Sequence, residues 1–248
     1  MSGTPTADHA PSGRFATTRW SLVCAAGRED AQARAALAAL CETYWYPLYA
    51  FLRRRGCSRE EAEDVTQAFF ARLLERGWVR SADRDRGRFR TFLLTALSRF
   101  LAKERDKLRA EKRGGGRVRL SLDFDAGETR YKLEPADEQT PDRLFERRWA
   151  LTVLDRALAR LEEEHGDDPA RAAKFAALKP LMTAADAASP YAEVAATLGM
   201  TEGAVKVAVH RLRKRYKELL RDEVAQTVGA PAAVEQELSD LRAALREG

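Results

Sequence analysis

The sequence predicts an all-α protein, because apolar residues recur with helical periodicity along nearly the whole chain and strand signals are scarce. Gly, Pro and acidic residues gather in one central stretch, which predicts a flexible acidic linker between two helical domains. The predicted parts are a disordered N-terminal tail (1–14), a first domain (15–113), the linker (114–143), a second domain (144–222) and a C-terminal tail with an amphipathic helix (223–248).

The composition excludes several classes of protein. No run of eighteen apolar residues exists and the first residues are polar, so we expect a cytoplasmic protein that makes no membrane contact. The cysteines are odd in number and widely spaced, which indicates buried thiols and neither a disulfide framework nor a zinc site. The histidines (His9, His165 and His210) are scattered, so no catalytic constellation forms. We therefore predict no enzymatic activity, no metal and no cofactor.

The first domain opens with a long amphipathic helix. Its apolar stripe consists of Leu37, Leu40, Cys41, Tyr44, Leu48, Phe51 and Leu52. Pro47 is expected to kink this helix, and Gly56 ends it.

The next helix begins at a capping box formed by Ser58 and Glu61. Its core stripe consists of Ala62, Val65, Phe69 and Leu73, and a second stripe beside it consists of Glu63, Gln67, Phe70 and Leu74. Aromatic and polar residues together in the second stripe indicate a partner surface. An equally good interpretation is that Phe70 and Leu74 widen the core.

The carboxylates at the start of the same helix allow an enzymatic alternative. Glu60, Glu63 and Asp64 suggest a carboxylate-metal nuclease, but no histidine or further acidic partner stands nearby. Favourable interaction of acidic residues with the helix dipole explains them more simply.

Residues 80–119 are strongly basic. They hold fourteen Lys and Arg against five Asp and Glu, with Trp78, Phe89, Phe92 and Phe100 beside or among them. Basic residues that follow a phosphate backbone, with aromatics on which bases stack, are typical of single-strand binding. A helical leucine stripe there leaves Arg99 and Lys103 outward, and one of Phe92 and Phe100 is expected in the core.

The second domain ends in two short helices with the spacing of a DNA-reading helix-turn-helix. Ser189 and Pro190 suit the start of the first helix, Gly199 ends it, and Thr201 caps the second. Ala195 is small where the two helices cross. The turn is therefore only about three residues long, which sets two helices at a steep angle.

The second of these helices is amphipathic and basic. Its apolar stripe consists of Val205, Ala208, Val209, Leu212, Tyr216 and Leu219, and its other face carries Lys206, His210, Arg213, Lys214 and Lys217. Residues 201–221 hold seven Lys and Arg against two Glu. Such charge beside a helix that fits the major groove favours DNA binding over a solvated helical hairpin.

The C-terminal tail carries the short apolar stripe Val234, Leu238, Leu241 and Leu245. Because so short a helix is marginal alone in water, we expect it to dock on the helix-turn-helix domain or on the helix containing Leu144 to Leu161. Its acidic residues favour a tail that tempers DNA binding by the basic reading helix.

Two segments resemble the extracytoplasmic-function (ECF) sigma factors of bacterial RNA polymerase. EEAEDVTQAFFARLLERGW (60–78) resembles the region-two helix that clamps the largest polymerase subunit, and YAEVAATLGMTEGAVKVAVHRLRKRY (191–216) resembles region four. The chain departs from the usual pattern at Phe92-Leu93, at Arg99 and at Lys103, which leaves backbone binding as the expected contact with the minus-ten element.

The resemblance implies three groups of site residues. The polymerase-binding residues would be Glu63, Asp64, Gln67 and Phe70. The residues at the minus-ten strand would be Arg88, Arg90, Arg99 and Lys103. The residues at the minus-thirty-five duplex would be Glu202, Gly203, Lys206, His210, Arg211 and Lys214.

By this resemblance the chain is a sigma factor that binds core RNA polymerase and directs promoter recognition and transcription initiation. Its expected partners are core polymerase and promoter DNA, and an anti-sigma factor is a further candidate. The alternative is a helix-turn-helix transcriptional regulator that acts without polymerase docking, and the stripe at Gln67 and Phe70 distinguishes the two.

Overall fold

The computed structural model describes residues 19–20, 23, 31–75, 88–104, 121–133, 140–183 and 188–246. Within these ranges the regular structure is helical, apart from one isolated antiparallel bridge. The helices are α2 (Ala31–Arg54), α3 (Arg59–Glu75), α4 (Phe89–Glu104), α5 (Phe124–Lys132), α6 (Pro141–Gly166), α7 (Pro169–Leu178), η3 (Lys179–Met182), α8 (Ala188–Leu198), α9 (Glu202–Ala225), η4 (Pro231–Ala233) and α10 (Val234–Arg246). The predicted all-α class is confirmed.

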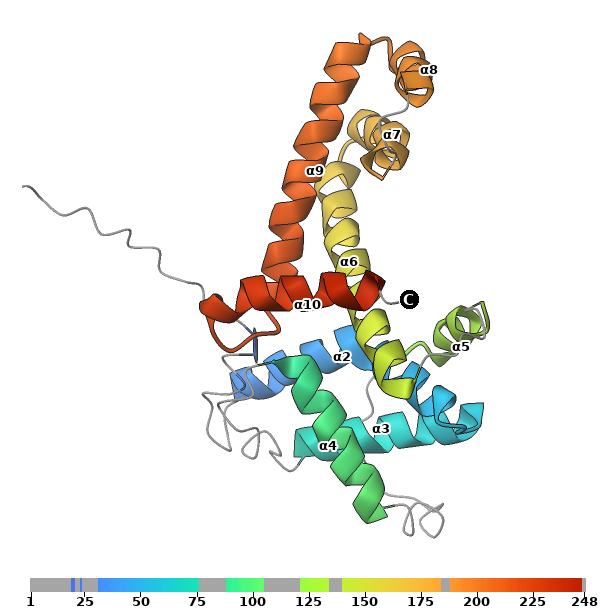
Figure 1. Ribbon diagram of the computed structural model, residues 1–248, viewed down its shortest axis with the longest axis vertical. Coiled ribbons are helices and arrows are strands. Elements are labelled where there is room, and N and C mark those ends of the chain that lie inside the picture. The colour runs from blue at the N-terminus through green and yellow to red at the C-terminus, as the bar shows by residue number, and fades with distance from the viewer. Residues whose placement is uncertain are drawn as a thin grey trace, which may run out of the picture.

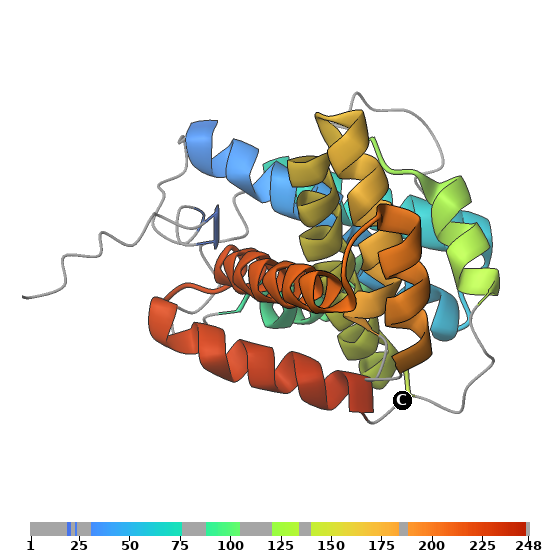
Figure 2. The same ribbon diagram turned by 90° about the horizontal axis from the view of Figure 1, so that it is seen from above.

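Two long helices, α6 and α9, run side by side and give the molecule its long axis (Figure 1). Helices α2 to α5 gather around the first half of α6. Helices α7 and α8 lie at the other end of the molecule, where α6 ends and α9 begins. Helix α10 crosses both long helices, which Figure 2 shows from above. None of the helices in the described part of the chain has the length and hydropathy needed to span a bilayer.

The first hydrophobic core is rich in aromatic rings and joins α2, α3 and α4 to the start of α6. Tyr44 of α2 stacks on Trp149 of α6 with ring centroids 4.4 Å apart, and Phe69 of α3 meets Phe100 of α4 at 5.7 Å. All seven residues of the predicted stripe in α2 are buried. The expected kink in α2 is also present, because Tyr44 has non-helical dihedral angles three residues before Pro47.

The second core lies between the end of α6 and the helices α7, η3, α8 and α9. Its buried residues include Leu161, Phe175, Tyr191, Val205 and Val209. Helix α6 contributes to both cores, since Trp149 and Val153 belong to the first, and Ala157 and Leu161 to the second. The hydrophobic clusters therefore divide in the middle of α6, whereas the predicted domain limit, between residues 143 and 144, lies in its first turn.

The central stretch contains an ordered helix, α5, where a flexible linker was expected. Asp123 caps it by accepting a hydrogen bond from the Ala126 backbone N–H at 3.0 Å. Phe124 packs on Trp45 with ring centroids 4.9 Å apart, and Gly127 lies so close to the Trp45 indole that an added Cβ would come within 2.5 Å of it. The expectation of flexibility is wrong for residues 121–133.

The C-terminal tail forms helix α10, as predicted, and docks on α6 and α9. Val234, Leu238 and Leu241 are buried there within the first hydrophobic core. The helix contacts the last turns of α9 and lies away from the opposite end, where α9 begins (Figure 1). The tail therefore completes a core and does not cover the basic face predicted to read DNA.

Candidate nucleic-acid interface

The helix-turn-helix predicted from the sequence is present as α8 and α9. Gly199 has a positive φ of 62°, and the Met200 backbone N–H donates to the Ala195 carbonyl at 2.9 Å, which closes the end of α8. The Thr201 hydroxyl accepts a hydrogen bond from the Ala204 N–H at 3.2 Å and so caps α9. Helix α8 begins at Ala188, one residue before the predicted cap.

One side of α9 is buried against α8 and α6, and the other is open. Val205, Val209, Leu212 and Leu219 are buried in the second core. The six residues predicted at the minus-thirty-five duplex are all exposed, and we call them the α9 reading face: Glu202, Gly203, Lys206, His210, Arg211 and Lys214. A side chain at Gly203 would meet nothing within 4 Å, so this end of α9 is free for close approach to a ligand.

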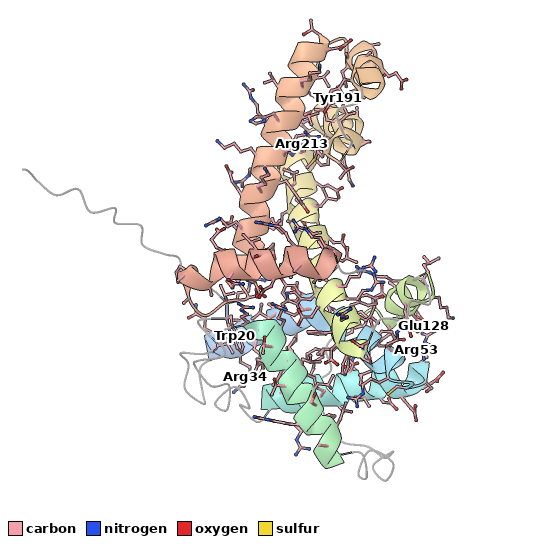
Figure 3. The ribbon with its side chains drawn as sticks, in the orientation of Figure 1. Trp20, Arg34, Arg53, Glu128, Tyr191 and Arg213 are labelled. Carbon is pink, nitrogen blue, oxygen red and sulfur yellow. The ribbon has the colours of Figure 1, made fainter. Side chains whose placement is uncertain are left out.

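Two other basic residues of α9, Arg213 and Arg215, make contacts within the domain. Arg213 donates from Nε and Nη2 to the carbonyls of Met182 and Leu181, at 3.0 and 2.9 Å. Arg215 pairs with Glu164 at 2.6 Å (Nη2 to Oε1). Arg213, which is labelled in Figure 3, was expected on the open basic face with Lys206 and His210; this expectation is wrong, because its guanidinium donates to the carbonyls at the end of η3.

Arg88 and Arg90, predicted at the minus-ten strand, are held by carboxylates of α10. Arg90 binds Glu237 with two hydrogen bonds, Nε to Oε1 at 2.7 Å and Nη2 to Oε2 at 3.1 Å. Its side chain also pairs with Glu146 of α6, and Arg88 pairs with Asp240 of α10. Only 6% of Arg90 is exposed. In this conformation Arg90 does not face a strand of nucleic acid, contrary to the expectation.

The remaining predicted minus-ten residues lie on or near α4. Arg99 is exposed on that helix. Lys103 belongs to the last turn of α4, but its side chain is outside the described residues, as are Trp78 and most of the basic segment. Phe92 and Phe100 are both buried in the first core, where only one of them was expected, so neither is a platform for base stacking.

The predicted polymerase-binding residues of α3 are split between surface and core. Asp64 is exposed, Gln67 is half-buried, and Glu63 is half-buried beside Arg59, to whose Nε its Oε1 accepts a bond of 2.7 Å. Phe70 has no exposed surface and packs against Phe69 with ring centroids 5.3 Å apart. The expectation that Phe70 points toward a partner is therefore wrong, and its alternative interpretation as a core residue is confirmed.

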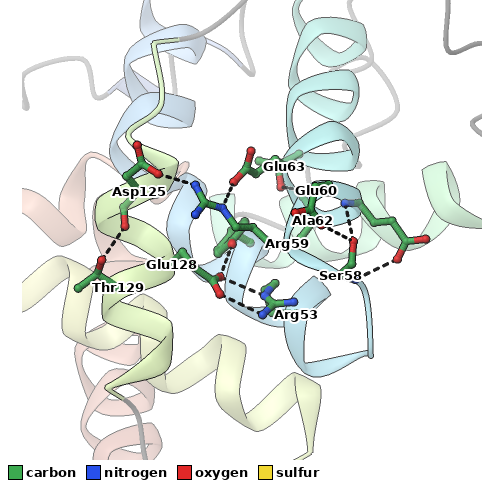
Figure 4. A network of polar contacts seen from close by, with 12 residues as sticks. Arg53, Ser58, Arg59, Glu60, Ala62, Glu63, Asp125, Glu128 and Thr129 are labelled. Carbon is green, nitrogen blue, oxygen red and sulfur yellow. Dashed lines mark hydrogen bonds and ion pairs between the residues drawn. The ribbon is translucent and has the colours of Figure 1, made fainter.

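Helix α5 lies beside this part of α3 and is joined to it and to α2 by a polar network (Figure 4). Glu128, which is 3% exposed, accepts a hydrogen bond from the Tyr49 hydroxyl at 2.6 Å and forms an ion pair with Arg53 at 3.1 Å. Arg59 bridges Glu63 of α3 and Asp125 of α5. The capping box is present too, with the Glu61 N–H donating to the Ser58 hydroxyl oxygen at 3.1 Å.

The polar network determines the charge state of the Glu128 carboxylate. Burial favours the neutral form of Glu128, but the hydrogen bond from Tyr49 and the charge of Arg53 outweigh it and hold the pKa of Glu128 below its ordinary value. Burial and the same hydrogen bond raise the pKa of Tyr49. Glu128 is thus an ionised buried anchor of α5, a role that its place in an acidic stretch did not reveal.

Two of the three carboxylates considered for a nuclease are engaged in other contacts, and the third, Asp64, is exposed. Glu60 accepts a hydrogen bond from the Ser58 hydroxyl at 3.0 Å, and Glu63 pairs with Arg59. Among the residues that the structure describes, no group of three His, Cys, Asp or Glu side chains is arranged to hold a metal ion.

Comparison with known proteins gives one match. The model of a protein family described as ECF sigma factor matches residues 49–225. The match begins within α2 and extends to the last residue of α9, so that it includes α3, α4 and the helix-turn-helix. Searches of curated proteins and of solved structures found no match.

Proposed function

Because the chain belongs to the ECF sigma factor family, we propose that it binds core RNA polymerase and directs it to promoters whose minus-thirty-five element meets the α9 reading face. The family consists of transcription initiation factors, and the sigma-factor role of this chain follows from membership. The assignment of polymerase and promoter contacts to particular residues is the proposal.

The observation that carries the DNA contact is the open first half of α9. Lys206, Arg211 and Lys214 are exposed there, and Lys206 Nζ lies 5.8 Å from the centroid of the Tyr191 ring. Arg213 and Arg215 of the same helix instead donate to carbonyl and carboxylate oxygens of the protein. The free N-terminal turn, with Gly203 in it, suits insertion into a major groove, where a recognition helix uses its N-terminal residues to contact base edges. Cationic side chains farther along the helix suit contacts to phosphates.

For the polymerase contact we propose Asp64, Gln67 and Glu63, without Phe70. These three side chains retain some exposure on one side of α3. Helix α5 borders the same surface through the Arg59 bridge, and therefore Asp125 is a further candidate for the edge of this contact. For the minus-ten strand, Arg99 and Lys103 remain the proposed contacts on α4.

The experiment is a fluorescence titration of the labelled protein with core polymerase. The double variant Asp64→Ala/Gln67→Ala should bind at least ten-fold more weakly while its circular dichroism stays unchanged. Glu193→Ala, at an exposed position on α8, is the control and should bind like wild type. Wild-type protein that does not bind core polymerase would instead favour a helix-turn-helix regulator that acts alone.

A further inference from the structure

The cluster that holds Arg88 and Arg90 has an excess of negative charge. Two guanidinium groups meet three carboxylates, from Glu146, Glu237 and Asp240. Glu237 has no exposed surface; it accepts hydrogen bonds from Arg90 and forms an ion pair with Arg88, whose Nε lies 3.3 Å from its Oε2. The cluster therefore presents no uncompensated cation to the surroundings, although both arginines lie at the start of the helix proposed to approach DNA.

The geometry of the cluster is one that a phosphate group also satisfies. Arg90 uses Nε and Nη2 in parallel on the two oxygens of Glu237, and Nη2 lies 3.2 Å from an oxygen of Asp240. A guanidinium fork recognises carboxylate and phosphate by the same paired hydrogen bonds. The carboxylates of α10 thus use guanidinium donors that are equally suited to phosphate oxygens.

The segment that follows α9 is tethered beside these arginines by main-chain contacts. The Phe89 backbone N–H donates to the Thr227 carbonyl at 2.8 Å, and Arg88 forms the isolated antiparallel bridge with Val228. The connection between α9 and α10 is thereby fixed to the first residue of α4. Movement of α10 about this connection would release both arginines from Glu237 and Asp240 while the tether stays in place, and Arg90 would keep its ion pair with Glu146 of α6.

The packing of α10 is incomplete, which makes such movement less costly. A cavity of about 970 Å³ lies between α10 and the helices α6, η3 and α9. Leu238, Leu241 and Leu245 of α10 line it together with Leu154, Leu158 and Tyr216. The cavity is partly open, so these apolar side chains lack close packing partners on that side. The charge cluster and the buried apolar residues Val234, Leu238 and Leu241 together hold α10 in place.

We propose that α10 is an intramolecular brake, in which Glu237 and Asp240 withhold Arg88 and Arg90 from single-stranded DNA. The brake rests on the proposed function, because it assumes that the start of α4 faces the opened promoter. It also replaces the earlier expectation that the tail covers the reading helix. Displacement of α10 adds two cations at the start of α4 and increases affinity for a single strand, whereas Arg99 lies half a helical turn around from Arg90 and more than two turns along the same helix.

The test compares full-length variants by the fluorescence anisotropy of a labelled single-stranded DNA of mixed sequence. Glu237→Gln/Asp240→Asn should bind about five-fold more tightly, within the usual range of coupling between sites. Its salt dependence should be steeper by about 1.4 units of slope, as two added phosphate contacts on a single strand predict at about 0.7 each. Asp222→Asn/Glu235→Gln also removes two negative charges, from exposed side chains near α10, and should behave like wild type.

Two further variants separate the brake from a purely structural role. Asp240→Asn alone removes the negative charge of a side chain that is 31% exposed, so this variant should fold even if the double variant does not. It should show a smaller gain in DNA affinity than the double variant. In an Arg88→Gln/Arg90→Gln background the same carboxylate substitutions should give no gain. Folded variants with unchanged DNA affinity, or a gain that persists without the arginines, would overturn the brake. Failure of wild type to bind core polymerase would contradict the proposed function separately.

Discussion

The hydroxyl of Tyr49 on α2 donates a hydrogen bond of 2.6 Å to Oε2 of Glu128 on α5. The two residues are 79 positions apart in the sequence, and both are buried. This contact, with the Arg53 ion pair beside it, orders a helix in a stretch whose composition is that of a linker. Helix α5 in turn determines what lies next to the proposed polymerase-binding side of α3.

Tyr49→Phe should destabilise the protein by about 1–3 kcal/mol, because the buried Glu128 carboxylate loses a donor. Glu128→Gln should cost a similar amount, and the double variant less than the sum, since both substitutions disrupt one network. Urea unfolding followed by circular dichroism measures all three. Additive losses would show that the two side chains do not interact in the folded protein.

The same carboxylate predicts acid sensitivity. The pKa of Glu128 is held below its ordinary value in the folded protein, so its contribution is complete at pH values above the ordinary pKa of about 4.3. That contribution is lost as the pH falls through the folded pKa of Glu128, where its carboxylate becomes protonated. The protonated group no longer attracts the charges of Arg53 and Lys132 or accepts as strongly from Tyr49. Melting curves between pH 3 and 7 should therefore show a shallower acid loss for Glu128→Gln than for wild type. Identical slopes would contradict this.

Phe70→Ala should lower the free energy of unfolding by about 3–5 kcal/mol, because it opens a cavity at a fully buried ring. Gln67→Ala on the same helix is half-buried and should cost much less. Denaturation of the two variants under the same conditions distinguishes core from surface. A Phe70→Ala variant as stable as wild type would contradict the core position of Phe70 and support a contact with a partner.

Lys206→Ala and Arg211→Ala test the α9 reading face. A lost phosphate contact should reduce the salt dependence of duplex binding by about one unit of slope, and a lost base contact should cost about 1–3 kcal/mol at one position. Lys217→Ala, at an exposed position farther from the start of α9, is a control of equal charge. If neither pattern is seen, another face of the protein meets DNA.

Local signals in the sequence predicted the local structure well. The Thr201 cap, the Gly199 turn and the stripe of α9 depend on residues a few positions apart, so their spacing alone indicates the helix-turn-helix. The exposure of the α9 reading face follows from the same periodicity. Its contact with DNA stays a prediction.

Contacts between distant residues were not predictable in the same way. Arg90 reads as a free cation in a basic segment, and only the fold brings it to Glu237, 147 positions later. Arg213 has the spacing of an exposed residue, but its guanidinium reaches carbonyls at the end of η3. Phe70 lies at the edge of an apolar stripe, where periodicity does not distinguish a wide core from a partner surface.

The most direct test of the central claim is run-off transcription with purified core polymerase and this chain as the only sigma factor. Genomic fragments of the source organism serve as templates, and the transcripts are mapped at their 5′ ends. We predict discrete transcripts that require the protein and are lost with Lys206→Ala/Arg211→Ala, while a Lys217→Ala control retains them. Wild-type protein that binds core polymerase but yields no discrete transcript from any fragment would contradict a role in promoter-specific initiation.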